Sequence, residues 1–335
     1  LKLVWIKLLM ISWESAAATA AALAVGFALY RRIRPSIPTA DQVAQKWSSG
    51  LDGKVVAITG CNSGLGKETA RAILAHTHPR RVVLLCRSAS DAEATKRELA
   101  HLVEGTETEI IAEECDLASL DAIAKSVGRL VAAKVTIDVC ICNAGVATVP
   151  DFRKTKDGHE LQFGVNFLGH FLLAKLLMRA RKEGMRFILV SSGAYVGTKE
   201  LDIDDLSCEK TPYHLFTAYS RSKLCNILHA QALNARGIEA YAVDPGTVVS
   251  TNVARHLSPW MQRLFRIVMM LSTKTVAEGA ASSVYCAVAP PTQLCEHGDS
   301  LVVDCAPKKL AAVARDRHKA EELWTKAELI CAQFY

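Results

Sequence analysis

The sequence lacks the patterns that mark several classes of protein. No two of its 11 cysteines have CxxC spacing, and no group of cysteine, histidine and acidic residues has the spacing of a metal site. Lysine and arginine are scattered apart from one basic cluster at residues 31–34, so no nucleic-acid partner is expected. There is no internal repeat, and only an alanine-rich stretch near the start has low complexity. These absences argue against a metal-binding, repeat or nucleic-acid-binding protein.

The composition is typical of a folded α/β protein. Of the 335 residues, 50% are hydrophobic and 22% are charged, with a net charge of +6, which excludes a disordered or fibrous chain. The chain is long enough for one large domain. Several cysteines (Cys86, Cys140 and Cys142) lie in apolar runs, and the cysteine count is odd. We therefore interpret the cysteines as buried thiols in a reducing compartment.

The first 34 residues are predicted to anchor the chain to a membrane. Residues 15–30 carry no charge and are rich in alanine, and the basic cluster follows them directly. This run is shorter than the ~20 residues that span a bilayer as a helix, and residues 11–14 supply the missing length if Glu14 is buried near one end. The basic flank predicts that the following domain faces the cytosol. A cleaved secretory signal, or an interfacial amphipathic helix over residues 1–12, remains open.

Beyond a polar linker at residues 35–52, apolar strands alternate with helical patterns. Strands are expected at residues 54–59, 81–86, 109–113, 137–142, 186–190 and 238–243, and helices at 64–75, 91–103, 119–132, 158–181 and 216–235. The strands are short and apolar on both faces, as in a parallel sheet covered by helices. The pattern predicts a single Rossmann-like, doubly wound α/β domain over residues 53–310, with helices on both faces and a helical tail at 311–335.

A glycine-rich turn joins the first strand to the first helix. Residues 59–66 read TGCNSGLG. Glycines there allow a tight turn and a close backbone approach to a pyrophosphate at the helix N-terminus. The turn predicts a dinucleotide site formed by Gly60, Asn62, Ser63, Gly64, Leu65 and Gly66. A second small-residue turn, Asn143, Ala144 and Gly145, follows the fourth strand and joins this site.

The ends of the second and third strands indicate the type of cofactor. No acid follows the second strand to hold a ribose 2′-hydroxyl, and Arg87 stands there instead, with a guanidinium suited to a 2′-phosphate. NADP(H) is therefore favoured over NAD(H). Asp116, followed by Leu117, ends the third strand, where the carboxylate either caps the next helix or holds the adenine amine.

Three further residues point to proton transfer. Tyr219 and Lys223 lie four apart in the 216–235 helix and so share a face. The pKa of a free tyrosine, near ~10, is too high for acid–base work at neutral pH, and a nearby ammonium lowers it. Lys223 can also hold the nicotinamide ribose. Ser192 follows a strand, where its hydroxyl can hold a substrate oxygen. With the glycine turn, these residues predict an enzyme that moves a hydride to or from an oxygen-bearing carbon.

Over residues 54–304 this combination resembles the short-chain dehydrogenase/reductase family. The resemblance implies that Tyr219 is the general acid/base, that Lys223 modulates its pKa and binds the ribose, and that Ser192 holds the substrate. It also implies that Asn166 belongs to a proton relay. The segment Pro245, Gly246 and Thr247 matches the one that borders the nicotinamide.

Finer motifs resemble the retinol dehydrogenase and WW-domain oxidoreductase branch of that family. They are GKETA at residues 66–70, Cys86-Arg87, NFLGHFLL at 166–173 and YSRSKLCN at 219–226. Two features depart from the pattern. Cys142 replaces the first asparagine of the family's Asn-Asn-Ala-Gly, which we expect to leave cofactor binding intact. No tandem-tryptophan WW module precedes the enzyme domain, which argues against an adaptor protein.

An apolar face at residues 256–271, in a lid region expected at 256–290, indicates the substrate. Its side chains have helical spacing, typical of either a core helix or a lid over an apolar substrate. Beside a membrane anchor, in the endoplasmic reticulum or another organelle, the lid predicts an apolar alcohol and its aldehyde or ketone, retinoid-like or another lipid. A reductase of small soluble carbonyls and a catalytically silent nucleotide-binding scaffold are the alternatives, and a homodimer is left open.

Overall fold

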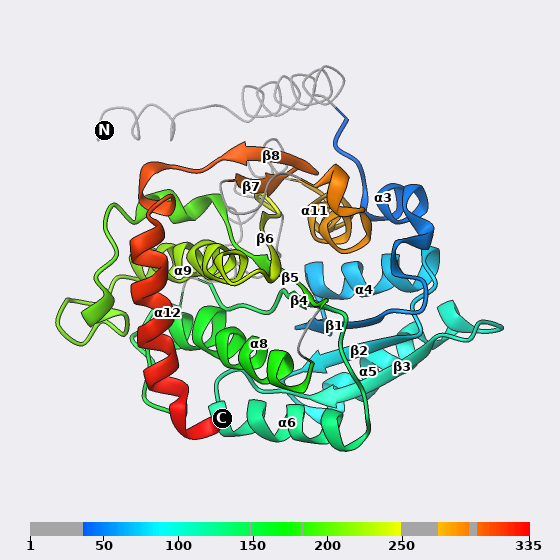
Figure 1. Cartoon of the computed structure of the whole chain (residues 1–335), viewed down its shortest axis with the longest axis horizontal. Helices are drawn as coiled ribbons and strands as arrows, with labels where there is room; N and C mark the ends of the chain where they lie inside the picture. The colour runs from blue at the N-terminus through cyan, green and yellow to red at the C-terminus, as the bar shows by residue number, and fades with distance from the viewer. Residues whose placement is uncertain (1–35, 148, 182–183, 249–273, 295–299) are drawn as a thin grey trace, which may run out of the picture.

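A mixed eight-stranded sheet forms the centre of the protein (Figure 1). The computed structural model describes residues 36–147, 149–181, 184–248, 274–294 and 300–335. The strands are β1 (Val55–Thr59), β2 (Arg81–Cys86), β3 (Glu109–Glu114), β4 (Val139–Cys142), β5 (Arg186–Val190), β6 (Glu239–Asp244), β7 (Ser300–Val303) and β8 (Ala306–Lys309). Their order is β3-β2-β1-β4-β5-β6-β7-β8, and among these strands β8 alone pairs antiparallel to its neighbour. The predicted doubly wound sheet is confirmed.

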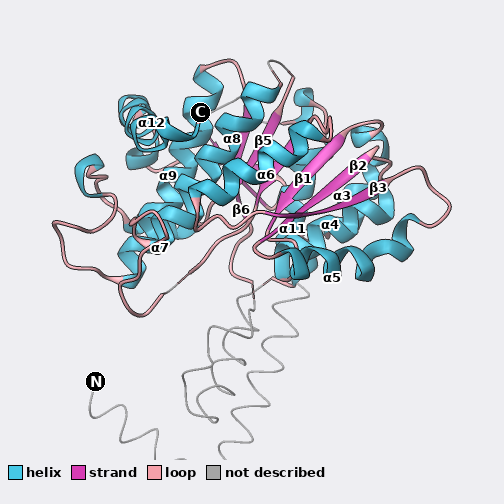
Figure 2. Ribbon diagram, turned by 90° about the horizontal axis from the view of Figure 1, so that it is seen from below, coloured by secondary structure: helices cyan, strands magenta, loops and turns pink. Residues whose placement is uncertain are grey.

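Helices cover both faces of the sheet (Figure 2). On one face lie α3 (Ala40–Lys46), α4 (Gly64–His76), α5 (Ala89–Leu99) and α11 (Val276–Val288), and on the other α6 (Leu120–Ala132), α8 (Gly169–Ala180), α9 (Leu215–Ala235) and α12 (Arg317–Cys331). Successive side chains of β1 alternate between the two cores: Val55 and Ala57 pack into one, Val56 and Ile58 into the other. Burial on both faces explains why the strands are apolar throughout.

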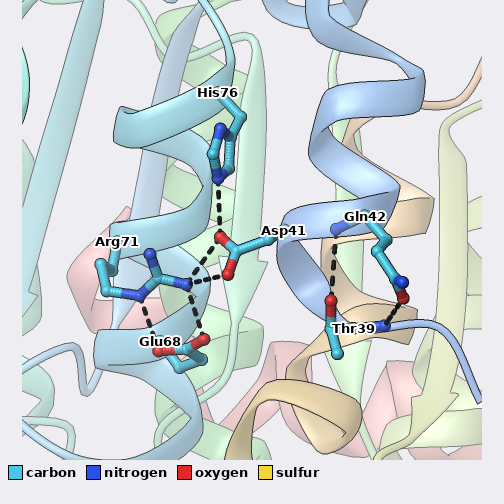
Figure 3. Close-up of polar contacts among 6 residues, drawn as sticks. All are labelled: Thr39, Asp41, Gln42, Glu68, Arg71 and His76. Carbon is cyan, nitrogen blue, oxygen red and sulfur yellow. Dashed lines mark hydrogen bonds and ion pairs between the residues drawn. The ribbon is translucent and has the colours of Figure 1, made fainter.

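Residues 35–52, expected to be a polar linker, contain a packed helix. Val43 of α3 is buried against the sheet domain. Asp41 reaches across to α4, where its carboxylate lies 2.6 Å from Arg71 Nη2 and 2.8 Å from His76 Nε2 (Figure 3). A capping box between Thr39 and the third helical residue starts α3. The helix is only seven residues long, too short for its apolar spacing to stand out in the sequence.

The helix expected over residues 158–181 is present as one continuous helix, Leu161–Ala180. It begins as α7 (Leu161–Phe163), passes through one turn of π-helix at Gly164–Leu168 (the π-turn) and continues as α8. Within the described residues this is also the segment, Leu161–Ala180, with the length and hydropathy of a membrane-crossing helix. Because 78% of its most apolar window is buried inside the protein, we interpret it as a core helix. The expected anchor at residues 1–34 lies outside the described residues.

The C-terminal part of the predicted lid region is a core helix instead. α11 begins with a capping box at Thr275 and packs against α3 and α4, with Val284 fully buried. The apolar face at 256–271 lies outside the described residues. The expected helical tail, α12, packs on α9 and places Trp324 in the core, 5.0 Å from the ring centre of Phe171.

Candidate active site

Most of the predicted site residues lie at the carboxyl ends of β1, β4, β5 and β6, which are neighbours in the sheet. The chain reverses its direction of winding between β1 and β4, since β1 lies between β2 and β4. In open α/β sheets ligands bind in the crevice at such a switch point. The topology therefore gathers side chains from distant parts of the sequence around one crevice.

The glycine turn is closely packed at one glycine and open at another. A Cβ on Gly66 would lie 2.3 Å from both the Gly60 carbonyl oxygen and Asn143 Nδ2, so no larger residue fits without moving the turn. Gly64 has a φ of +56° and nothing within 4 Å of the position of a Cβ. The open side of the turn thus lies at the first residue of α4.

The N-terminus of α4 is available for an anion. Ser63 is the N-cap residue, but its side chain makes no capping hydrogen bond. The first N–H groups of a helix have no partner within the helix, and the helix dipole favours negative charge there. Asn62, Ser63 and Gly64 are exposed and Leu65 is half-buried. These residues fit a dinucleotide pyrophosphate.

Asn143 and Ala144 hold the glycine turn against β4. The side chain of Asn143 donates to the Thr59 carbonyl at 2.9 Å. The backbone N–H groups of Asn143 and Ala144 both donate to the Thr59 hydroxyl oxygen, each at 2.9 Å. Thr59 was part of the predicted turn, but its side chain was given no role. It fixes the two turns in register.

Arg87 lies at the exposed end of β2. It makes no ion pair or hydrogen bond with any other described residue. Asp91 is the acidic residue nearest to Arg87 in the sequence. Its carboxylate accepts a hydrogen bond from the Ser88 hydroxyl at 2.8 Å, inside the first turn of α5. Among the described residues the guanidinium is therefore free to meet a phosphate.

Both carboxylate oxygens of Asp116, which lies two residues after the end of β3, have polar partners. One carboxylate oxygen accepts from the Ala118 N–H at 3.0 Å, and the other lies 3.1 Å from Lys156 Nζ. Helix α6 is capped by Ser119, so Asp116 closes the preceding turn and does not cap the helix. Leu117 is buried in the core. The contact between Asp116 and adenine stays a prediction.

The Tyr219–Lys223 pair lies on the face of α9 that meets β5. Lys223 is 4% exposed; its ammonium donates to the Val190 carbonyl at 3.0 Å and lies 5.7 Å from the centre of the Tyr219 ring. Burial lowers the pKa of Lys223 to about 8, against an opposing contribution from Asp244. Burial raises the pKa of Tyr219, Asp244 raises it further, and a hydrogen bond from Ser192 opposes both. The net shift of the Tyr219 pKa is upward, opposite in direction to the expected lowering, because burial outweighs the groups that favour the phenolate.

Asn166 binds the loop after β4 to helix α9. Its Oδ1 accepts from the Val146 N–H at 2.8 Å, and its Nδ2 donates to the Val146 carbonyl and to the Ser222 hydroxyl, each at 2.9 Å. That hydroxyl donates to the Tyr219 carbonyl at 2.8 Å. A Cβ on Gly145 would lie 3.1 Å from Asn166 Oδ1 and 3.4 Å from Lys223 Nζ, so the loop passes very close to both.

Asp244, which the sequence reasoning did not assign, closes the site at the end of β6. It is 7% exposed, and its Oδ1 accepts from the Gly246 N–H at 2.8 Å. Its Oδ2 lies 3.1 Å from the position of a Cβ on Gly193, the residue after Ser192. Asp244 thus lies between the serine turn and the predicted nicotinamide segment. Its place directly before Pro245 was the available signal. Thr247 is exposed, and its carbonyl accepts from the Lys274 N–H.

Comparison with known proteins agrees with this geometry. Residues 54–203 match the short chain dehydrogenase family. The chain is 37% identical to human retinol dehydrogenase 14, over 94% of this chain and 98% of that protein. It is 36% identical to the human WW domain-containing oxidoreductase, over 82% of this chain and 67% of that protein. The crystal structure of an uncharacterized protein from Mycobacterium paratuberculosis superimposes with a TM-score of 0.64 and 28% identity, covering 89% of this chain and 98% of that one. The chain therefore belongs to the short-chain dehydrogenase family of oxidoreductases, in the branch that contains the retinol dehydrogenases and the WW domain-containing oxidoreductases.

Proposed function

We propose that this protein is an NADP(H)-dependent oxidoreductase that interconverts an apolar alcohol and its aldehyde or ketone, with Tyr219 as the acid/base. The observations that support the proposal are the hydrogen bond between Ser192 and Tyr219 and the 5.7 Å between Lys223 Nζ and the centre of the Tyr219 ring. Family membership supports oxidation and reduction at a CH–OH carbon.

NADP(H), when bound, supplies or accepts the hydride. The open N-terminus of α4 fits the pyrophosphate, and we assign the ribose hydroxyls to Lys223. Arg87 supports the choice of NADP(H), because it is exposed and makes no ion pair among the described residues. A guanidinium in that position can donate two hydrogen bonds to a 2′-phosphate.

In the direction of reduction, Tyr219 donates its phenolic proton to the carbonyl oxygen of the substrate. A phenol with the ordinary tyrosine pKa of about 10 is protonated at neutral pH, as a proton donor must be, and burial raises the pKa of Tyr219 further. The Ser192 hydroxyl, bonded to Tyr219, can hold the same substrate oxygen. After proton transfer, the Lys223 ammonium stabilises the tyrosinate across the 5.7 Å that separates it from the ring centre.

The substrate class rests on the names of the relatives and on the pattern of the sequence. Retinol dehydrogenases act, by name, on a long apolar alcohol. We extend this to an apolar lid at 256–271 and to a membrane anchor at 1–34, from which a lipid substrate would reach the site. Both segments lie outside the described residues.

A screen of NADPH oxidation tests the proposal. Purified protein should oxidise NADPH with retinal, steroid ketones or fatty aldehydes, and prefer these to short soluble aldehydes. Tyr219→Phe removes the donated proton and keeps the ring, so it should abolish turnover while the dissociation constant for NADPH stays near wild type. NADPH binding without turnover of any carbonyl would favour the scaffold alternative, and full activity of Tyr219→Phe would disprove the assigned mechanism.

A further inference from the structure

His170 is a buried histidine whose two ring nitrogens both have partners. The residue is 0% exposed in α8, directly after the π-turn. Its Nδ1 lies 3.0 Å from the Asn166 carbonyl oxygen, and its Nε2 lies 2.9 Å from the Thr59 hydroxyl. The His170 ring thus connects Thr59, at the end of β1 where the glycine turn begins, to Asn166, which is hydrogen-bonded to Ser222 of α9.

The partners determine the tautomer of this ring. A carbonyl oxygen can only accept, so Nδ1 of His170 carries the proton and Nε2 accepts from the Thr59 hydroxyl. The Thr59 oxygen also accepts from the N–H groups of Asn143 and Ala144. Its one proton points to Nε2 at 2.9 Å in preference to the Ile141 carbonyl at 3.4 Å, and its two lone pairs are both in use. Burial lowers the pKa of His170 to about 4, which keeps the ring neutral.

The π-turn places Asn166 for this connection. Hydrogen bonds in a π-turn join residues five apart, and the Gly169 N–H donates to the Gly164 carbonyl in this way. Asn166 directs its carbonyl to His170 and its side chain to Val146 and Ser222. Ser222 in turn donates to the Tyr219 carbonyl. A continuous series of hydrogen bonds therefore runs from the nucleotide turn to the backbone of the tyrosine.

We propose that His170 is a positioning residue that aligns the Tyr219 helix with the cofactor turn through the series Thr59–His170–Asn166–Ser222. The inference rests on the proposed oxidoreductase function. His170 touches neither cofactor nor substrate in this scheme. It acts by holding the phenol and the nicotinamide site in register, a register to which hydride and proton transfer are sensitive.

Matched substitutions separate this role from a purely structural one. His170→Phe keeps a planar aromatic ring, slightly larger than imidazole, and removes both hydrogen bonds. His170→Asn keeps a donor near Nδ1 for Asn166, and His170→Gln keeps a polar atom near Nε2 for Thr59. The control is His229→Phe, because His229 is equally buried, lies on α9, and its ring nitrogens bond to no described residue.

We expect His170→Phe to lower kcat by about 10- to 100-fold, with a smaller change in the dissociation constant for NADPH, because misalignment of about 1 Å has an effect of this size. His170→Asn and His170→Gln should each recover part of kcat. His229→Phe should change the melting temperature but leave kcat within about threefold. If His170→Phe keeps kcat within twofold, or if His229→Phe lowers kcat equally, the proposal is overturned.

Two readouts keep the test independent of folding and of turnover. If His170→Phe does not fold, Thr59→Val should lower kcat and Thr59→Ser should restore it; equal kcat in these two variants would contradict the proposal. Nitrogen NMR of the wild type should show His170 as the Nδ1–H tautomer from pH 7 down to about 5, and an Nε2–H signal would exclude the series. A wild-type enzyme without turnover would instead refute the proposed function, while the tautomer result would still stand.

Discussion

The ionisation of Lys223 should limit carbonyl reduction at alkaline pH. A drop in its pKa from 10.5 to about 8 means that the buried site disfavours the ammonium by about 3 kcal/mol. Reduction needs both the Lys223 ammonium and the Tyr219 phenol, and raising the pH removes the ammonium first, because burial raises the tyrosine pKa. We expect kcat/KM to fall about tenfold per pH unit above pH 8, or about 100-fold by pH 10.

The assay measures kcat/KM for NADPH oxidation with one aldehyde substrate between pH 6 and 10. The wild type is compared with two variants. Lys223→Arg keeps a positive charge that is not lost in this range, so its profile, at whatever height, should stay level above pH 8. Asp244→Asn removes the carboxylate that raises the Lys223 pKa, so the fall should begin at lower pH. A wild-type profile level to pH 10, or a Lys223→Arg profile that falls with it, would refute the reasoning.

Two further substitutions test the cofactor site. Arg87→Asp should weaken NADPH binding by about 10- to 150-fold, which corresponds to the loss of one charge-assisted hydrogen bond of about 1.5–3 kcal/mol. NADH binding should stay nearly unchanged. Equal losses of affinity for the two cofactors, measured by cofactor fluorescence, would remove the case for NADP(H). Gly66→Ala should weaken the binding of both NADPH and NADH by about 100-fold, because its Cβ must move the turn by about 1 Å. The control is Gly128→Ala, at an open position in α6, which should bind both cofactors as the wild type does and have a slightly higher melting temperature. Similar affinities of the two alanine variants would show that the turn is not held as described.

The sheet could be predicted because its strands have a recognisable sequence pattern. A strand such as β2, with five of its six residues buried, must be apolar on both faces, and an apolar run of that length between helical patterns has few other interpretations. The end of β2 was equally readable, since Arg87 follows it directly. The nucleotide turn and the Tyr219–Lys223 pair could likewise be predicted from short local patterns in the sequence.

What the sequence did not reveal depends on distant contacts. In α3 only three of seven residues are buried, so its pattern resembles a polar linker until Asp41 is seen to meet Arg71 and His76. The roles of His170 and Asp244 are likewise invisible in one dimension. Each becomes apparent only when β1, α8 and β6 are brought to the same edge of the sheet.

The tyrosine itself shows why spacing alone does not decide chemistry. Tyr219 and Lys223 are four positions apart in the sequence, which places them on one helix face and predicts a lowered tyrosine pKa. Folding buries both groups, and burial disfavours the phenolate and the ammonium alike. The result is a tyrosine kept protonated beside a lysine that readily gives up its charge. A raised pKa makes Tyr219 a weaker acid, so in the proposed reduction the Lys223 ammonium has to stabilise the tyrosinate as it forms.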